Sequence, residues 1–113
     1  MPFIDLWKIK PQEICPGTRI RAPHGENLML SFVEIDEGAE VPLHNHPHEQ
    51  GGVVLEGTME LVIGSESRIL EPGMLYLIPS NEPHLARAVG GPVKALDVFS
   101  PIREEYIAQE DEL

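Results

Sequence analysis

The chain has 113 residues, enough for one hydrophobic core but not for two, so we expect one domain spanning residues 1–113. Its formal net charge of −11 opposes contact with nucleic-acid phosphates, so nucleic acid is not an expected partner. We find no signal peptide and no apolar segment of membrane-spanning length, so we expect a cytoplasmic protein without a membrane partner. The one cysteine, Cys15, can form no internal disulfide, which fits a reducing compartment.

Short apolar runs alternate with turn residues along most of the chain. The turn signals, rich in Gly, Pro, Asn and Asp, recur roughly every eight to ten residues, and no apolar run shows a helical period. This pattern predicts an all-β sandwich or barrel with its core at about residues 28–100. The predicted strands are Leu28–Ile35, Val53–Leu55, Met59–Ile63, Arg68–Leu70, Met74–Ile78, His84–Val89 and Val93–Phe99.

The first of these runs is apolar on both faces. Leu28, Leu30 and Phe32 lie on one side, while Met29, Val33 and Ile35 lie on the other. A strand covered on both sides suits a barrel whose outer face meets another subunit. We therefore expect a homodimer.

After Phe99 the strand pattern ends. Ser100 and Pro101 precede the segment Ile102–Ala108, and proline is favoured at the first position of a helix. The sequence therefore predicts a short C-terminal helix that begins at Pro101.

The histidines are concentrated at two places. His44, His46 and His48 lie within five residues, followed directly by Glu49 and Gln50. His84 closes the turn formed by residues 79–83. If His44 and His46 lie on one strand, their imidazoles point to the same face and can chelate one metal ion inside a barrel. Further ligands must then come from neighbouring strands, and Gln50 and His84 are the available donors.

Glu49 and Gln50 compete for the same role. A carboxylate is the stronger anionic ligand, but adjacent residues on a strand face opposite sides, so both cannot readily point inward. His48 is expected in a loop at the barrel mouth, with its imidazole exposed to solvent.

The spacing of these residues is similar to the two motifs of the cupin family. Gly38, His44, His46, Gln50 and Gly57 follow the first motif, with Gln50 in place of the usual glutamate. A second set follows the other motif, with Asn81 in place of its usual glycine. It consists of Gly73, Pro79 and His84.

The cupin resemblance implies a fold and a cofactor. The fold is an all-β, double-stranded β-helix or jelly-roll barrel. The cofactor is one divalent metal ion, for which the motif spacing selects Gln50 rather than Glu49. Zn, Ni, Mn, Co and Fe all accept imidazole and carbonyl donors. The implied metal ligands are His44, His46, Gln50 and His84.

A narrower resemblance covers roughly Leu28 to Tyr106. Residues 44–50, Tyr76–Pro79, Pro83-His84 and Leu96–Glu104 resemble the KdgF-type cupins of pectin and alginate degradation. The resemblance implies that a small sugar acid, a 4,5-unsaturated monouronate, is opened to the linear 4-deoxy-5-keto uronate. The alternatives are another metal-dependent cupin enzyme, a dioxygenase or an isomerase, and a sugar-binding cupin without catalytic activity.

The same resemblance implies that Asp97, Phe99 and Arg103 complete the site. Asp97 and Phe99 share one face of the last predicted strand, and a carboxyl group there is costly to bury unless it is paired or functional. The alternative for Asp97 is a structural ion pair with Arg103. Arg103 is suited to binding a substrate carboxylate, and Arg19 and Arg21 are the other arginines considered for that role.

Two departures from the family pattern concern the pocket walls. Gly51-Gly52-Val53 stands where we expect bulkier residues, including an aromatic one. Leu85 stands where a glycine is usual.

Overall fold

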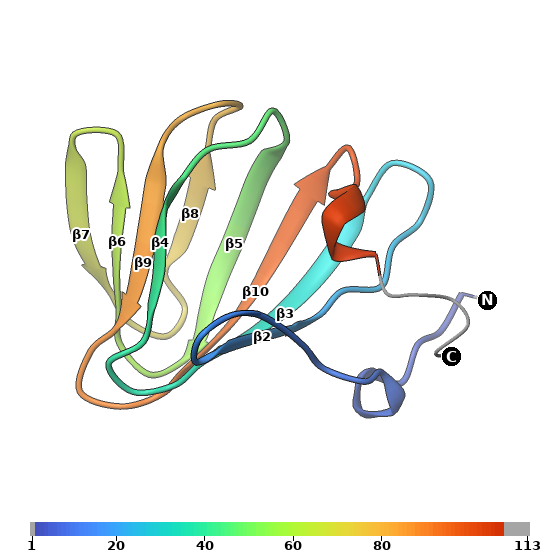
Figure 1. Ribbon diagram of the computed structural model, residues 1–113, viewed down its shortest axis with the longest axis horizontal. Coiled ribbons are helices and arrows are strands. Elements are labelled where there is room, and N and C mark those ends of the chain that lie inside the picture. Colours follow the sequence, from blue (N-terminus) through green and yellow to red (C-terminus); the bar gives the residue numbers. More distant parts are fainter. Residues whose placement is uncertain (1, 108–113) are drawn as a thin grey trace.

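The computed structural model describes residues 2–107, and within that range ten strands form two antiparallel sheets (Figure 1). One sheet has the strand order β1-β2-β3-β10-β5-β8, and the other has the order β4-β9-β6-β7. The all-β prediction is confirmed. The strands are β1 (Gln12–Cys15), β2 (Thr18–Arg21), β3 (Met29–Ile35), β4 (Glu40–His44), β5 (Glu49–Glu56), β6 (Met59–Ile63), β7 (Glu66–Leu70), β8 (Leu75–Ile78), β9 (His84–Ala88) and β10 (Val93–Ser100).

Three of these strands, β1, β2 and β4, carry no apolar run and were not predicted as elements. In β2, Thr18 and Ile20 face the interior, while Arg19 and Arg21 point outward and bind acidic side chains. Such a strand shows only a brief alternation, which is hard to distinguish from a loop in the sequence. Ile20 nevertheless belongs to the core, so the sheet extends N-terminally of residue 28.

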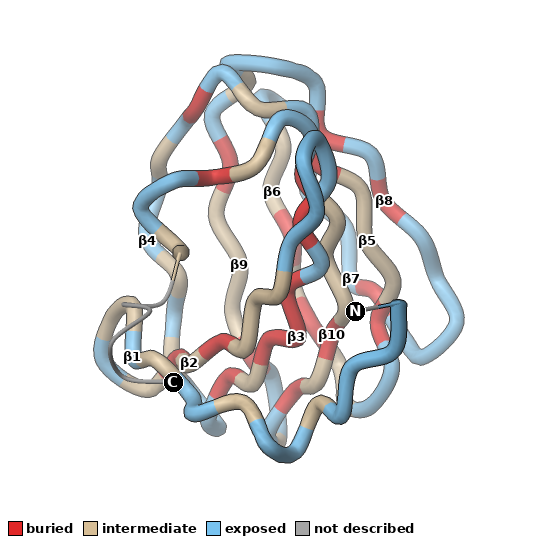
Figure 2. The backbone as a smooth tube through the Cα atoms, turned by 90° about the vertical axis from the view of Figure 1, so that its right-hand side faces the viewer, coloured by how far each residue is buried: buried red, intermediate tan, exposed pale blue. Residues whose placement is uncertain are grey.

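The core fills the space between the two sheets. Val54, Val93 and Ile78 are almost completely buried, and Figure 2 shows buried stretches on both layers. Each such side chain contributes about 1.5–3 kcal/mol through its removal from water. The two layers therefore stabilise each other through one shared apolar interior.

Strand β10 lies in the middle of the larger sheet, between β3 and β5. Its inward face carries Val93, Ala95, Asp97 and Phe99, and the three apolar residues are 1%, 2% and 2% exposed. The sequence predicted that Asp97 and Phe99 share one face. This strand therefore carries both core residues and candidate site residues.

Part of the outer face of the same sheet, over β3, β10, β5 and β8, is apolar. On edge strand β8, Leu75 and Leu77 are 74% and 78% exposed. Leu30 of β3 is 40% exposed, whereas Phe32 is covered by the indole of Trp7, with ring centroids 5.6 Å apart. Trp7 belongs to a 3₁₀ helix, η1 (Leu6–Lys8).

The C-terminal helix prediction is wrong in its start and type. The described element is a single 3₁₀ turn, η2 (Glu104–Tyr106), preceded by Arg103 in an extended conformation. Residues 101–103 form no helix because Arg103 carries its side chain into the interior, where only 7% of the residue is exposed. Ala108, the last residue of the predicted helix, lies outside the described residues. No helix described within residues 2–107 is long and apolar enough to cross a membrane.

Candidate metal centre

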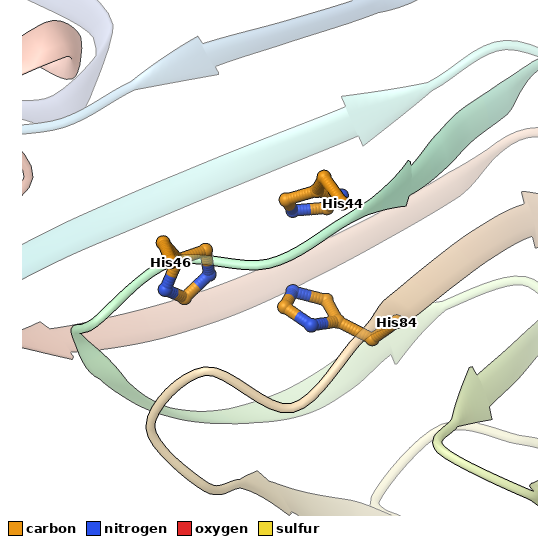
Figure 3. A group of neighbouring side chains, drawn as sticks. All are labelled: His44, His46 and His84. Carbon is orange, nitrogen blue, oxygen red and sulfur yellow. The ribbon is translucent and has the colours of Figure 1, made fainter.

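Three histidines converge between the sheets near one end of the barrel (Figure 3). His44 ends β4, His84 begins β9, and the two residues are cross-strand partners. His46 lies in the loop between β4 and β5. The ring centroids are 4.2 Å apart for His44 and His84, 5.0 Å for His46 and His84, and 5.6 Å for His44 and His46. One ring nitrogen of each histidine lies within 4.8 Å of the other two.

The sequence predicted the convergence of His44 and His46, but for a reason that is wrong. The two do not share a strand face, because β4 ends at His44 and its register shifts after Val41. Instead, His46 is held by the loop that precedes β9. The backbone N–H of Asn81 donates a hydrogen bond to the His46 carbonyl at 2.7 Å, and the Ser80 hydroxyl donates to the Pro47 carbonyl.

Asn81 occupies the position where the cupin motif usually has glycine. Its φ is +66°, in the left-handed region that asparagine tolerates better than most side chains. The substitution therefore preserves the turn that leads into His84.

Backbone carbonyls fix the orientation of all three imidazoles. The Nδ1 atoms of His44, His46 and His84 lie 2.8 Å, 3.1 Å and 2.7 Å from the carbonyl oxygens of Pro42, His48 and Glu82. In a neutral imidazole, Nδ1 then donates its proton to the carbonyl, and Nε2 keeps a free lone pair. Each histidine is thus prepared to bind a metal through Nε2.

Gln50 brings an oxygen atom to the same place. It begins the inward-facing part of β5 and is 7% exposed, whereas Glu49 is exposed, as strand alternation predicts. The Gln50 Oε1 atom lies 3.1 Å from His46 Nε2. With the tautomer described above, both of these atoms are acceptors and no proton lies between them. The buried Nε2 of His84 also has no hydrogen-bond partner. Such a group of facing lone pairs fits a divalent cation.

His46 and His84 are favoured in the neutral form that a metal requires. Burial, followed by the charge of Arg103 and the neighbouring His84, lowers the pKa of His46 to about 4. Burial also lowers the pKa of His84. Both side chains are therefore neutral at physiological pH.

Asp97 lies next to this group and accepts two hydrogen bonds. The Tyr76 hydroxyl donates to Oδ1, and the Gln50 Nε2 atom donates to Oδ2 at 3.2 Å. Burial raises the pKa of Asp97 to about 6, although both hydrogen bonds and the charge of Arg103 act in the opposite direction. A carboxyl group with this pKa can hold or release a proton near neutral pH.

Arg103 lies beneath η2 and is enclosed by aromatic rings. Its guanidinium carbon is 4.0 Å from the centroid of Tyr106 and 5.2 Å from that of Phe99. Its Nη2 atom is 2.9 Å from a Glu105 carboxylate oxygen, while its Nε has no hydrogen-bond partner. The ion pair described for Arg103 is with Glu105, so the alternative of a structural Asp97–Arg103 ion pair is wrong.

The other two arginines considered as carboxylate clamps lie elsewhere. Arg19 binds Asp36 at 3.0 Å and Arg21 binds Glu34 at 2.8 Å, both on the outer face of the sheet. Neither lines the interior cavity that His44 and His84 border.

Two hollows meet at the candidate site. An interior cavity of about 50 Å³ is lined by Gln50, Asp97 and Phe99, together with His44, His84, Arg103 and Tyr106. A second pocket of about 220 Å³ shares His44, Arg103 and Tyr106 with it. Because the same side chains line both hollows, the interior cavity adjoins the larger pocket.

The sequence did not assign Tyr76, Glu105 and Tyr106 to the site. Tyr76 shares the inward face of β8 with Ile78, and that alternation was the available signal. The prediction that the His48 imidazole is exposed is wrong. His48 is half-buried, its ring centroid lies 5.4 Å from that of His46, and its buried Nδ1 has no partner.

Comparisons with known proteins support the predicted resemblance. Residues 31–99 match the family model described as a cupin domain. The pectin degradation protein KdgF of Dickeya dadantii is 34% identical over 83 residues, which cover 73% of this chain and 76% of that protein. The structure of KdgF from Halomonas sp. superposes with a TM-score of 0.86 at 31% identity, covering 93% of this chain and 99% of that chain. The L-ectoine synthase of Hyphomonas neptunium is 31% identical over 81 residues, covering 68% of this chain and 59% of that protein.

The lowered pKa of His46 and the raised pKa of Asp97 change folding stability in opposite directions as pH falls. Replacing Asp97 removes one of these two contributions. Between pH 6.5 and about 4, unfolded histidine binds a proton that folded His46 does not, so acidification destabilises the fold. Between about pH 6 and 3.8, folded Asp97 binds a proton that the unfolded chain does not, so acidification favours the fold. We expect the metal-free Asp97→Asn variant to lose stability more steeply than the wild type as pH falls. Urea unfolding across this range measures it, and parallel curves would contradict it.

Proposed function

The chain belongs to the cupin family and to the KdgF type within it, and on that premise we propose that it opens the ring of 4,5-unsaturated monouronates in pectin breakdown. The product is the linear 4-deoxy-5-keto uronate. The observation that carries the proposal is the inward-facing carboxyl group of Asp97, hydrogen-bonded to Gln50 beside three imidazoles and in one cavity with a guanidinium. The similarity to the pectin degradation protein KdgF supports the substrate class.

We assign His44, His46, His84 and Gln50 as ligands of one divalent metal ion. The set of three imidazoles and one amide oxygen is neutral, and Zn, Ni, Mn, Co and Fe all accept these donors. A bound ion would supply a Lewis acid for the oxygens of the substrate.

The reaction rearranges the substrate without gain or loss of atoms. The hemiacetal O1–H loses a proton, the bond between C1 and the ring oxygen breaks, and C4 gains a proton. C1 becomes an aldehyde, and C5 becomes a ketone. We assign the proton transfer at C4 to Asp97, because its pKa of about 6 leaves both protonation states accessible near neutral pH.

Arg103 and Phe99 serve substrate binding in this proposal. The guanidinium of Arg103 matches the two oxygens of a carboxylate, and Glu105 now occupies one of its donors at 2.9 Å. Phe99 packs against His46, and the guanidinium of Arg103 lies over its ring, so Phe99 forms an apolar wall between the histidines and the carboxylate clamp. The pocket of about 220 Å³, which is lined by His44 and Arg103, offers space for a sugar acid.

An alternative without catalysis would use the same pocket only to bind a sugar acid. A buried carboxyl group with a raised pKa is an energetic cost that simple binding does not require. Asp97 therefore favours an enzyme.

We also infer a cytoplasmic location, because Cys15 is a free thiol. Fractionation of cells that produce the protein tests this.

We further propose that the outer face of the six-stranded sheet binds a second copy of the chain. Cross-strand rows place Val53 beside Leu75, and Val98 and Leu77 on either side of Gly51. On β10, β5 and β8 these two rows carry no charged residue, so two copies with a net charge of −11 each can meet there without opposing like charges. The contact would be the same patch on both copies.

Metal should be bound by the native state and should stabilise it. We expect a chelator to lower the melting temperature of the metal-loaded protein, because a ligand bound only to the folded state stabilises that state. The double variant His44→Ala, His46→Ala should contain no stoichiometric metal by elemental analysis. Substitution of His24, which lies outside the cluster, is the matched control and should leave metal content unchanged. Full metal content in the double variant would refute the ligand assignment.

The proposed activity can be followed by ultraviolet absorbance. An unsaturated uronate absorbs through its conjugated enol ether and carboxylate, and ring opening destroys this chromophore. With metal in excess, wild-type protein should accelerate the decay of unsaturated galacturonate. Asp97→Ala should slow it by about 10²–10⁴-fold. Arg103→Ala should mainly raise KM.

Three outcomes have separate meanings. If metal-loaded wild-type protein leaves the decay no faster than buffer, the uronate assignment is wrong. If Asp97→Ala retains wild-type activity, only the proton-transfer role is wrong. Oxygen uptake by the wild type with candidate substrates would instead indicate a dioxygenase.

Replacing exposed leucines tests the proposed dimer. We expect light scattering to give the mass of two chains for the wild type and of one chain for the double variant Leu75→Glu, Leu77→Glu, with unchanged circular dichroism. Leu43→Glu is a matched control, since Leu43 is 64% exposed on the other sheet. A wild-type mass of one chain would refute the dimer.

A further inference from the structure

Tyr76, Gly52 and Asp97 form one row across three neighbouring strands. Asp97 of β10 is the cross-strand partner of Gly52 on β5, and Gly52 is the partner of Tyr76 on β8. Neighbouring strands lie about 4.8 Å apart, so roughly 10 Å separates the backbones of Tyr76 and Asp97. The Tyr76 hydroxyl nevertheless donates a hydrogen bond to Asp97 Oδ1. Its ring therefore extends across the strand between them.

The crossing is possible because Gly52 has no side chain. A Cβ atom on Gly52 would lie 2.4 Å from Asp97 Oδ1 and 2.4 Å from both Cε2 and Cζ of Tyr76. Real Cβ atoms essentially never approach other heavy atoms this closely, so even alanine would displace the ring or the carboxyl group. Gly51 differs, since its Cβ would meet the flexible end of Leu77 at 3.3 Å on the outer face.

The two oxygens of Asp97 have different donors. Tyr76 binds Oδ1, while the Gln50 amide nitrogen binds Oδ2 at 3.2 Å. With its nitrogen held by Asp97, Gln50 directs Oε1 toward His46 Nε2 at 3.1 Å. If the amide rotated by half a turn, its N–H₂ group would face the histidines, and that group has no lone pair to offer a metal.

We propose that Tyr76 is a positioning residue, whose hydroxyl reaches across Gly52 to hold Asp97 and thereby keeps the Gln50 oxygen directed at the three histidines. The inference rests on the proposed metal ligand set. Under this proposal Gly52 and Tyr76 do not touch the metal and act on it through Asp97, which orients the ligand Gln50. Such outer contacts typically change metal affinity by about 10–100-fold.

The affinity for Zn²⁺, measured by competition with a chromophoric chelator, tests the proposal without any assay of activity. Tyr76→Phe keeps the ring and removes the hydroxyl, and it should weaken Zn²⁺ binding by about 10-fold. Asp97→Ala should weaken binding as well. Adding Tyr76→Phe to Asp97→Ala should change affinity no further, because the hydroxyl then has no carboxylate to hold.

Gly52→Ala and Gly51→Ala form a matched pair on the same strand. We expect Gly52→Ala to weaken Zn²⁺ binding as Tyr76→Phe does, and Gly51→Ala to leave it unchanged. Circular dichroism confirms that each variant is folded, and Tyr76→Phe decides the question if Gly52→Ala does not fold.

The outcomes separate this inference from the proposed metal centre. If wild-type protein does not bind Zn²⁺, the metal centre and the inference both fail. If the wild type binds Zn²⁺ and Tyr76→Phe binds it equally well, only the role of Tyr76 fails. Independent, additive losses from Tyr76→Phe and Asp97→Ala would also overturn it, since they would show that the hydroxyl does not act through Asp97.

Discussion

The register of β10 between β3 and β5 determines which residues can meet inside this barrel. Because side chains alternate along a strand, this register places Asp97 and Phe99 inward, opposite Gly52 and Gln50 of β5. A slip of one residue would turn Asp97 toward solvent and bring Leu96 and Val98 inside. The same hydrogen-bonded ladder also aligns Val93 and Ala95 with the core. Core packing and the candidate chemistry therefore depend on one constraint and cannot vary independently.

The interior is divided between apolar packing and a polar end. His46, Gln50, His84 and Arg103 are all buried, although burying unpaired polar groups costs free energy. Backbone carbonyls satisfy the Nδ1 atoms of both histidines, and Asp97 satisfies the Gln50 amide. The atoms left without a partner include His84 Nε2 and Arg103 Nε, which border the cavity and the neighbouring pocket. Polar atoms left unsatisfied beside a hollow are typical of a functional site, where stability is sacrificed for binding.

Much of this arrangement could be predicted from the sequence. The spacing of turns indicated an all-β barrel, and the motif spacing brought together His44, His46 and His84 with Gln50. The turn spacing is a local pattern of two to ten residues, which the sequence displays directly, whereas the ligand set was implied by the resemblance to the two cupin motifs. The shared face of Asp97 and Phe99 on β10 was predicted from strand alternation.

The remaining features depend on contacts between distant segments. His46 reaches the cluster through a hydrogen bond from the loop at Asn81, and Arg103 is held by aromatic rings and Glu105. Neither arrangement leaves a periodic pattern in the sequence. Strand β2 was not predicted because its alternation spans only four residues, with an arginine at each outward position, and such a short polar segment is hard to distinguish from a loop. Tyr76 was not assigned to the site because only the three-strand row connects it to Asp97.

The absence of a side chain at Gly52 has a consequence for how related sequences can differ. The ring of Tyr76 occupies the space that a side chain on Gly52 would need, so the two positions compete for one space although they lie on neighbouring strands. A chain with an aromatic residue at the position of Gly52 would have to carry a small one at the position of Tyr76. The two positions are therefore expected to covary, exchanging bulk between strands while the volume of the cavity wall stays nearly constant.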